Sequence, residues 1–244
     1  MNPSVLILGA TSDIGMALAE KFAQNGYPLV LAARNSQRLA PLQSDLEIKY
    51  GTGCEVLEFD ITHTDTHQAT WDKLQEKPGI TICVAGYMNE NERVIKDTAE
   101  TLKTIATNFT GPVALLNIIA ADYAEKGKGI IAGISSVAGL RGRQSNYIYG
   151  SAKAGFTAYL SGLRNRMYSH GVHVLTVLPG FMDTKMTAHL KLPRLLTAQP
   201  ARVADAIYRG ILKKKNTIYI KWFWKWIMFI IRHIPESIFK KKKL

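Results

Sequence analysis

The sequence contains little cysteine: Cys54 and Cys83 are the only two among 244 residues. Both lie in apolar runs that favour strands, so we expect two reduced core thiols in a reducing compartment rather than a disulfide scaffold. Acidic residues are also sparse, with 19 Asp and Glu against 31 Lys and Arg, which gives a net charge of +12. A charge of this sign favours an anionic partner: nucleic acid, a phosphorylated substrate or a membrane surface.

Much of the positive charge is confined to the last 32 residues, at Lys213 to Lys215 and Lys240 to Lys243. This clustering indicates that the charge has a local role in the C-terminal part of the chain and does not form an extended nucleic-acid-binding surface, so we expect no nucleic-acid partner. The sequence also lacks a charged leader followed by an apolar signal core, because an apolar strand is predicted from Ser4 onward. We therefore expect a cytoplasmic protein.

No linker, repeat or low-complexity segment divides the chain before its C-terminal tail. With 47% hydrophobic residues, the chain has enough apolar surface for a large core. We expect one domain over residues 1–221 and an appended aromatic and basic tail over residues 222–244.

Seven short apolar runs alternate with segments of helical period. Because these runs are almost continuously hydrophobic, we expect strands that are buried on both faces and joined by right-handed helical crossovers. The predicted fold is a single α/β Rossmann-type domain, a doubly wound seven-stranded parallel sheet with helices on both faces. The predicted strands are Ser4 to Gly9, Pro28 to Ala33, Cys54 to Phe59, Ile80 to Val84, Gly129 to Ile134, Val172 to Val177 and Thr217 to Ile220.

The first predicted strand ends in a glycine-containing turn that leads directly into a helix. Gly9 permits a sharp turn, Gly15 permits close packing of the helix on the strand, and the free N–H groups of the helix start attract phosphate. We expect this turn to bind the pyrophosphate of a dinucleotide; a plain strand-to-helix turn is the alternative. The turn residues are Gly9, Ala10, Thr11, Ser12, Asp13, Ile14 and Gly15.

The end of the second predicted strand bears on the choice of dinucleotide. An acidic residue there accepts hydrogen bonds from the ribose 2′-hydroxyl, whereas a basic residue pairs with a 2′-phosphate. The sequence has Arg34 at this point and no acid between Ala32 and Asn35. We therefore favour NADP(H) and keep NAD(H) as the second choice; a solvated loop charge is the other interpretation of Arg34.

Tyr149 and Lys153 lie one helical turn apart, so a phenol and an ammonium share one helical face. A free tyrosine, with a pKa of about 10, exchanges protons poorly at neutral pH. A nearby ammonium and a positively charged oxidised nicotinamide favour the phenolate, so we expect a lowered pKa for Tyr149. A core tyrosine is the structural alternative. His63 and His67 have helical metal-ligand spacing, but no third ligand is evident, so we expect solvated histidines and no metal site.

The order of these residues resembles the short-chain dehydrogenase/reductase family. The catalytic set of that family is Asn, Ser, Tyr and Lys, and this sequence has Asn108, Ser136, Tyr149 and Lys153, with Ser136 thirteen residues before Tyr149. It departs from the family at Asp13, which replaces the middle glycine of the turn, and before Ala85, where two asparagines are missing. Further matches, which imply cofactor contacts, are Asp60, Ile61, Ala85, Gly86, Pro179, Gly180 and Thr184.

This resemblance implies an oxidoreductase that moves hydride between a nicotinamide and a carbonyl, and a homodimer or homotetramer. Tyr149 would give a proton to the carbonyl oxygen, Ser136 would hydrogen-bond that oxygen, and Asn108 would hold a water that links Lys153 to solvent. Taken singly, Ser136 is equally well explained as a turn cap and Asn108 as a helix-surface amide. A dinucleotide-binding regulator without turnover is the alternative of another class.

The tail is rich in tryptophan and lysine, and it is too short and too interrupted to span a bilayer, which needs about 20 apolar residues. Lys225 and Arg232 share one helical face and leave an apolar face opposite. These features favour an amphipathic helix that lies on the inner face of the membrane over anionic lipid. The alternatives are a helix that closes the substrate pocket and one that packs on another subunit.

Parts of the chain more narrowly resemble the bacterial reductase subunits of decaprenylphosphoryl-ribose 2′-epimerase. The matching stretches are Ser135 to Gly139, Arg141 with Arg143, Ser145 to Tyr147, Tyr149 to Ser151, Met186 to Lys191, Arg232 to Pro235 and Ser237 to Phe239. The resemblance implies reduction of a 2-keto-pentose on a polyprenyl phosphate, a flavin oxidase as partner, and NADH as the usual cofactor of that group. Arg141 and Arg143 would clamp the lipid phosphate, with loop charges as the alternative. A steroid, retinoid or fatty acyl ketone is the alternative substrate.

Overall fold

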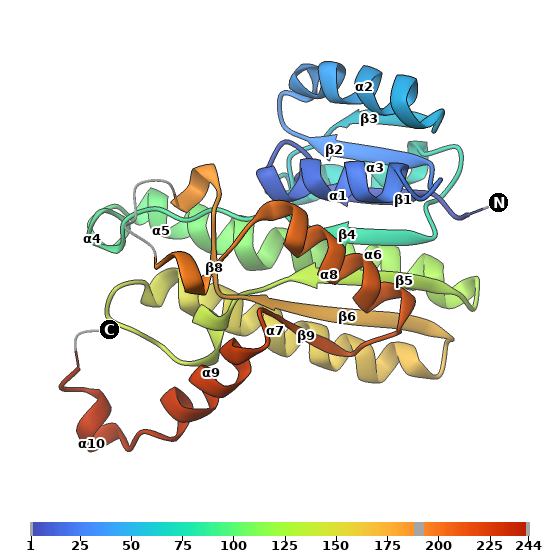
Figure 1. Cartoon of the computed structure of the whole chain (residues 1–244). Coiled ribbons are helices and arrows are strands. Elements are labelled where there is room, and N and C mark those ends of the chain that lie inside the picture. The colour runs from blue at the N-terminus through green and yellow to red at the C-terminus, as the bar shows by residue number, and fades with distance from the viewer. Residues whose placement is uncertain (1, 188–192, 243–244) are drawn as a thin grey trace.

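The computed structural model describes residues 2–187 and 193–242, so most of the Met186 to Lys191 stretch lies outside the described residues. Seven strands form one parallel sheet in the order β3-β2-β1-β4-β5-β6-β9 (Figure 1). The predicted doubly wound, seven-stranded sheet is confirmed. Its strands are β1 (Val5–Leu8), β2 (Leu29–Ala33), β3 (Cys54–Glu58), β4 (Ile80–Cys83), β5 (Gly129–Ile134), β6 (Val172–Pro179) and β9 (Thr217–Ile220).

The central strands lie between two layers of helices because their side chains are apolar on both faces. Every residue of β1, β2 and β4 is buried, as expected of parallel strands that are covered on both sides. The chain runs outward from β1 through β2 to β3 and then returns to pair β4 with the other side of β1. The carboxyl ends of β1 and β4 therefore flank the crevice in which doubly wound sheets bind ligands.

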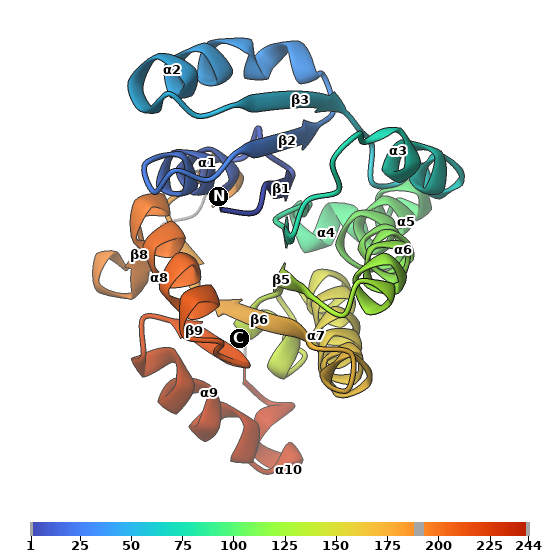
Figure 2. The same cartoon turned by 90° about the vertical axis from the view of Figure 1, so that its right-hand side faces the viewer.

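The helices divide between the two faces of the sheet (Figure 2). Leu18, Phe22 and Ile207 belong to the hydrophobic cluster on one face, and Leu116 and Phe156 belong to the cluster on the other. The first layer comprises α1 (Asp13–Ala23), α2 (Ala40–Tyr50) and α8 (Pro200–Leu212); the second comprises α3 (His67–Lys73), α5 (Thr98–Ile105), α6 (Gly111–Glu125) and α7 (Tyr147–Tyr168). The short helix α4 (Asn91–Val94) follows β4.

A π-helical turn over Ala106–Thr110 joins α5 to α6 into one continuous run. This run, Thr98–Glu125, is long and apolar enough to cross a membrane, but half of its most apolar window is buried inside the protein. It is a core helix, because Leu116 and Ile119 pack in the second hydrophobic cluster. Gly111 lets the run pass close to the chain after β3, since a Cβ at Gly111 would lie 2.1 Å from the carbonyl oxygen of Ile61.

A second, two-stranded parallel sheet was not predicted from the sequence. It pairs β7 (Phe181–Met182) with β8 (Thr197–Ala198) just beyond the end of β6. The predicted boundary of β6 was also too early, because this strand continues from Val177 to Pro179 and pairs there with β9.

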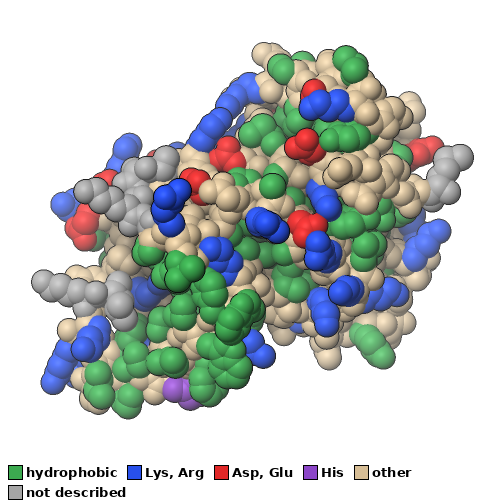
Figure 3. Space-filling view, in the orientation of Figure 1, with side chains coloured by type: hydrophobic (Ala, Val, Ile, Leu, Met, Phe, Trp, Pro, Cys, Tyr) green, Lys and Arg blue, Asp and Glu red, His purple; other side chains and the backbone are tan. Residues whose placement is uncertain are grey.

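After β9 the chain forms α9 (Phe223–His233) and α10 (Glu236–Phe239). Trp224 and Met228 are buried and join Val137 and Leu178 in a third hydrophobic cluster, so one face of α9 packs on the domain. Figure 3 shows hydrophobic side chains gathered over this region, with lysine and arginine side chains at its edge. The exposed apolar side chains of the tail are Trp222, Trp226, Phe229, Ile230 and Ile238.

Candidate active site

The turn between β1 and α1 has no room for a side chain at either of its glycines. Gly9 has a φ of +89°, and a Cβ there would lie 3.0 Å from the backbone nitrogen of Ala85. A Cβ at Gly15 would lie 2.5 Å from the carbonyl oxygen of Gly9. Ser12 caps α1, because its hydroxyl accepts a hydrogen bond from the Gly15 N–H at 3.0 Å. The N-terminus of α1 is thus held at the crevice between β1 and β4, where an anionic group is favoured.

Asp13, the departure from the family turn, connects the two sides of the crevice. Its Oδ2 accepts a hydrogen bond of 2.7 Å from the backbone N–H of Lys185. Lys185 begins the 3-10 turn Lys185–Thr187, which follows β7. The aspartate therefore ties the turn after β1 to the loop after β7, a bond that a glycine at this position would not make.

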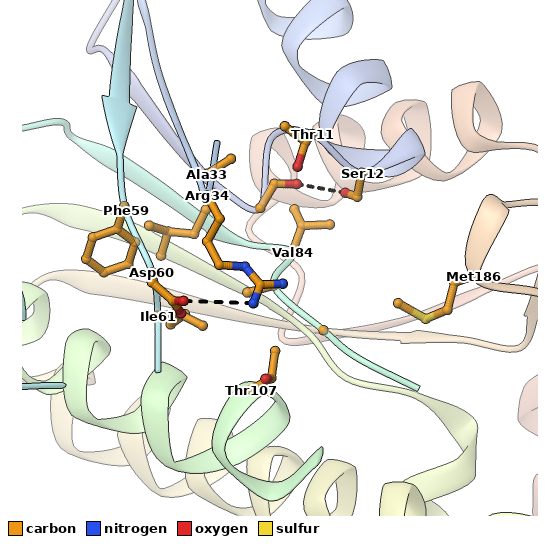
Figure 4. A pocket seen from close by; sticks show the side chains of 14 residues that line it. Thr11, Ser12, Ala33, Arg34, Phe59, Asp60, Ile61, Val84, Thr107 and Met186 are labelled. Carbon is orange, nitrogen blue, oxygen red and sulfur yellow. Dashed lines mark hydrogen bonds and ion pairs between the residues drawn. The ribbon is translucent and has the colours of Figure 1, made fainter. Parts of the chain in front are cut away.

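Two adjoining cavities occupy the crevice. The first, of about 180 Å³, extends from the turn after β1 to the ends of β2, β3 and β4 (Figure 4). The second, of about 160 Å³, shares Thr11, Ser12 and Gly86 with the first and extends to Tyr149 and Lys153. Together they form one crevice with the glycine turn at its middle.

Arg34 and Asp60 face each other across the first cavity. The Arg34 Nη1 lies 3.8 Å from the Asp60 Oδ2, and the arginine is exposed (Figure 4). Burial alone would raise the pKa of Asp60, but hydrogen bonds from Thr62 and the charge of Arg34 outweigh it and hold that pKa below its usual value. Ile61 and Ala85 also line this cavity.

An acidic residue lies next to the loop after β2, although the sequence of that loop contains none. Glu58, at the end of β3, accepts hydrogen bonds from the backbone N–H groups of Asn35 at 2.9 Å and Ser36 at 2.7 Å. These bonds lower the pKa of the Glu58 carboxyl. The Glu58 carboxylate thus lies against the loop that follows Arg34.

The structure brings together the four residues predicted as the catalytic set. Tyr149 and Lys153, both on α7, line the second cavity. Asn108 lies in the π turn, and a Cβ at Gly86 would be 3.3 Å from its Oδ1 and 3.6 Å from the Lys153 Nζ, so these two polar groups converge there. Ser136 lies at the end of β5, close enough to Tyr149 to lower the pKa of the phenol.

Asn108 is a buried amide and not a helix-surface residue. Its Nδ2 donates hydrogen bonds to the carbonyl oxygens of Tyr87 and Thr104 at 2.6 and 2.8 Å. Its Oδ1 accepts one from the Tyr87 N–H at 3.2 Å. Both amide protons are therefore used within the protein, and Oδ1 retains one lone pair near Lys153.

The ionisation of Tyr149 differs from the sequence-based expectation. In the chain alone, burial raises the pKa of Tyr149 to about 12, and the Ser136 hydroxyl and the Arg143 guanidinium oppose this without outweighing it. The Lys153 Nζ lies 5.8 Å from the Tyr149 ring centroid and donates a hydrogen bond of 3.0 Å to the carbonyl oxygen of Ile134. Burial lowers the pKa of Lys153 to about 8. Arg143, and not Lys153, is the cation that acts on the phenol.

The two arginines expected to clamp a phosphate lie in different surroundings. Arg141 donates hydrogen bonds to the backbone of the tail and to Glu236, so the predicted two-arginine clamp is not formed. Arg143 lies near Tyr149. Its Nε is buried and has no hydrogen-bond partner among residues 2–187 and 193–242.

Of the remaining predicted positions, some line the second cavity and others lie elsewhere. Thr184 and Ile14 line the second cavity. Pro179 ends β6, and Gly180 lies against the tail, because a Cβ there would be 2.0 Å from the Trp224 ring. The expectation of a solvated His67 was wrong: its ring is buried beside Phe59, and its Nε2 bonds the carbonyl oxygen of Ile61.

A family model described as short chain dehydrogenase matches residues 3–194. The chain belongs to the short-chain dehydrogenase/reductase family. It is 32% identical over 240 residues to an uncharacterized oxidoreductase of Mycobacterium tuberculosis, an alignment that covers 97% of this chain and 96% of the relative. An uncharacterized oxidoreductase of Streptomyces coelicolor is 31% identical over 244 residues, with 98% and 95% covered.

Two solved dehydrogenase structures superimpose on nearly the whole chain. A short-chain dehydrogenase from Sphingobium yanoikuyae in complex with NADPH has a TM-score of 0.83 and 26% identity, with 96% of this chain and 97% of that one covered. The bulky-bulky ketone specific alcohol dehydrogenase from Comamonas testosteroni has a TM-score of 0.80 and 26% identity, with 96% of each chain covered. As a short-chain dehydrogenase, this protein is an NAD(P)-dependent oxidoreductase that acts on CH–OH and C=O groups.

The crevice of this short-chain dehydrogenase includes residues that the sequence did not indicate. Thr107 lines the first cavity, Met182 and Lys185 line the second, and Met186 lines both. Met182 lies in the two-residue strand β7, and Lys185 and Met186 lie in the 3-10 turn that follows it; elements this short have no hydrophobic period to detect. Met186 was marked only as the start of the stretch that resembles the epimerase reductases. Thr107 had a signal in its position directly before Asn108.

Proposed function

We propose that this short-chain dehydrogenase reduces a keto sugar carried on a polyprenyl phosphate. The observation that carries the proposal is Arg143, a half-buried arginine near Tyr149 whose Nε is buried and has no partner among the described residues. Burial of a charge without an anionic partner costs free energy, and a substrate phosphate would restore the pairing. A steroid, retinoid or fatty acyl ketone, the alternative substrate, has no phosphate to offer.

The side chains around the second cavity support proton transfer in the reductive direction. NADPH, when bound, supplies a hydride to the carbonyl carbon. Tyr149 donates its phenolic proton to the carbonyl oxygen, and the Ser136 hydroxyl donates a hydrogen bond to the same oxygen. Because burial raises the pKa of Tyr149 to about 12, the phenol stays protonated at neutral pH, which is the form that reduction uses.

Lys153 and Asn108 return a proton to Tyr149 in this scheme. A pKa of about 8 allows Lys153 to exchange protons near neutral pH, which an ordinary lysine does poorly. The free lone pair of the Asn108 Oδ1 is available to hold a water beside the ammonium. The proton thus passes from solvent to Lys153 and then to the phenolate that remains after each turnover.

We assign NADP(H) as the preferred cofactor on the basis of Arg34, which is exposed at the first cavity and can pair with a 2′-phosphate. The Sphingobium yanoikuyae structure, 26% identical, contains NADPH. NAD(H) is the second candidate, because the Glu58 carboxylate occupies the backbone N–H groups of Asn35 and Ser36 and would repel a 2′-phosphate there.

The tail supports docking on the inner face of a membrane. Trp226 and Phe229 are exposed on α9, and with Lys225 and Arg232 they line a groove of about 200 Å³. Aromatic side chains beside basic ones suit the interface of an anionic bilayer. We expect the double substitution W226S/F229S to abolish binding to anionic lipid vesicles. Substitution of the exposed Ile48 on α2 by serine is the matched control, and equal loss in both variants would contradict the docking.

The substrate proposal also implies a flavin oxidase that supplies the keto sugar, and a cytoplasmic homodimer or homotetramer. Co-purification with such an oxidase and sedimentation of the purified chain test these two points. A strictly monomeric, fully active enzyme would contradict the second.

The decisive experiment follows NAD(P)H oxidation with a polyprenyl-phosphoryl 2-keto-pentose. We expect Tyr149→Phe to lower kcat by roughly 10²- to 10⁴-fold with cofactor binding intact. Arg143→Gln should raise KM for this substrate but not for an uncharged ketone. If uncharged ketones react equally well and ignore Arg143, the phosphate assignment is wrong. A folded wild type that binds cofactor and turns over no ketone would instead support the regulator.

A further inference from the structure

Arg141 holds the end of the C-terminal tail with most of its donors. Its Nη1 donates hydrogen bonds to the carbonyl oxygens of Ile231, Arg232 and Ile234 at 2.9, 2.9 and 2.7 Å. Its Nη2 donates one to the Glu236 Oε2 at 2.8 Å. The guanidinium carbon also lies 3.8 Å from the centroid of the Phe239 ring. Only 15% of this side chain is exposed.

Two of the carbonyl groups that Arg141 binds, those of Ile231 and Arg232, belong to the last turn of α9, and the third belongs to its C-cap residue, Ile234. The last carbonyls of a helix have no partner within it, and the helix dipole makes this end negative. A guanidinium satisfies several of them at once because its donors are fixed in one plane. Arg141 therefore caps α9 and, through Glu236 and Phe239, also fixes α10.

The chain segment that carries Arg141 is the one that leads to the reacting groups. Arg141 directly follows the 3-10 turn Val137–Leu140, whose N-cap is Ser136, and it lies two residues before Arg143. The same turn packs on α9 through Val137, which shares a cluster with Trp224 and Met228.

A second contact joins the tail to the other wall of the second cavity. The Trp224 ring packs edge-on against Phe181, with ring centroids 5.2 Å apart, and its Nε1 donates a hydrogen bond to the carbonyl oxygen of Leu196 at 3.3 Å. Phe181 belongs to β7, whose next residue, Met182, lines the cavity with Tyr149. The tail thus touches both segments that flank the second cavity.

We propose that Arg141 is a positioning residue, through which the C-terminal tail sets the position of the loop that carries Ser136 and Arg143. The tail is then part of the active-site support, and displacement of the tail lowers turnover. The inference has two parts. The mechanical half, that the tail positions the loop, is independent of the function proposed above. The catalytic half, that displacement of the tail lowers turnover, rests on that function.

The mechanical half is tested by hydrogen exchange of the full-length protein. We expect Arg141→Ala to accelerate exchange of amides 137–146, 223–234 and 236–239 by about tenfold or more, because the segments open locally. Amides 172–178 of β6 should exchange as in wild type, which shows that the fold is intact. Arg209→Ala removes an exposed arginine with its own ion pair to Asp205 and should change neither segment. Unchanged exchange of amides 137–146 in Arg141→Ala would overturn the inference.

The catalytic half is tested on the substrate that wild type reduces. We expect kcat of Arg141→Ala to fall by about tenfold, since a small displacement of reacting groups is costly, while KM for NADPH is unchanged. Millimolar guanidinium should restore part of the loss, and Glu236→Gln should give a smaller loss of the same kind. Faster exchange with wild-type kcat would show that the tail does not support catalysis. If wild type reduces no substrate, the proposed function fails, and the exchange result alone decides the tail contact.

Discussion

Replacement of Lys153 by methionine should make the protein more stable while it abolishes turnover. The Lys153 side chain is only 3% exposed, and burial lowers its pKa from 10.5 to about 8. A lysine with a lowered pKa destabilises the fold wherever it is charged; the full cost applies below pH 8 and fades as the pH rises toward 10.5. At about 1.4 kcal/mol per pH unit, the cost is roughly 3 kcal/mol at pH 7 and roughly 1 kcal/mol at pH 9.5.

The substitution also removes the hydrogen bond from Lys153 to the Ile134 carbonyl oxygen. Loss of one such bond costs about 1–2 kcal/mol at either pH. We therefore expect Lys153→Met to be more stable than wild type by about 1–2 kcal/mol at pH 7 and close to it at pH 9.5. The stability of Lys153→Met relative to wild type should therefore change by about 2 kcal/mol between pH 7 and pH 9.5. This change tests the prediction best, because the lost hydrogen bond contributes equally at both pH values and cancels.

Urea unfolding of both proteins at pH 7 and pH 9.5 measures this quantity. Lys128→Met, a substitution of an exposed lysine, serves as the control and should leave the difference from wild type the same at both pH values. If the stability difference between Lys153→Met and wild type is independent of pH, burial does not shift the ionisation of Lys153, and the proton-return role loses its basis.

Three further outcomes follow from the structure. Arg34→Leu should raise the Kd for NADPH by about tenfold, as expected for the loss of one charge-assisted phosphate contact, and leave that for NADH nearly unchanged; equal effects would refute the 2′-phosphate role. Gly180→Ala should displace α9 and shift tryptophan emission to longer wavelength, because the new Cβ would lie 2.0 Å from the Trp224 ring; Gly162→Ala, with no atom within 4 Å, is the control. Both cysteines are buried, so a thiol reagent should modify neither in the native protein, and rapid labelling would contradict that burial.

The sheet could be predicted because its strands are apolar on both faces and separated by helical periods. The pair β7 and β8 could not, since strands of two residues have no period to detect. The π turn at Asn108 was equally invisible, because its sequence differs in no way from that of an ordinary helix.

Within the site, residue types and order predicted which side chains converge on the crevice, but not their electrostatics. The pKa of Tyr149 depends on burial and on Arg143, neither of which a spacing of four residues reveals. The role of Arg141 was missed for another reason. Three of its partners are backbone carbonyls some ninety positions away in the sequence, and a carbonyl carries no sequence signature.

The position of β9 at the edge of the sheet suggests why lysines cluster on either side of this strand. In the part of the chain that the structure describes, β9 pairs only with β6 and leaves its other edge without a strand. An open strand edge is a template for pairing with other molecules, and lysines at such an edge oppose this. Lys213 to Lys215 precede β9 and Lys221 follows it. During synthesis, moreover, β6 emerges well before β9, so its apolar edge is exposed until the last strand arrives. We therefore expect these lysines to oppose pairing of the β9 edge with other molecules.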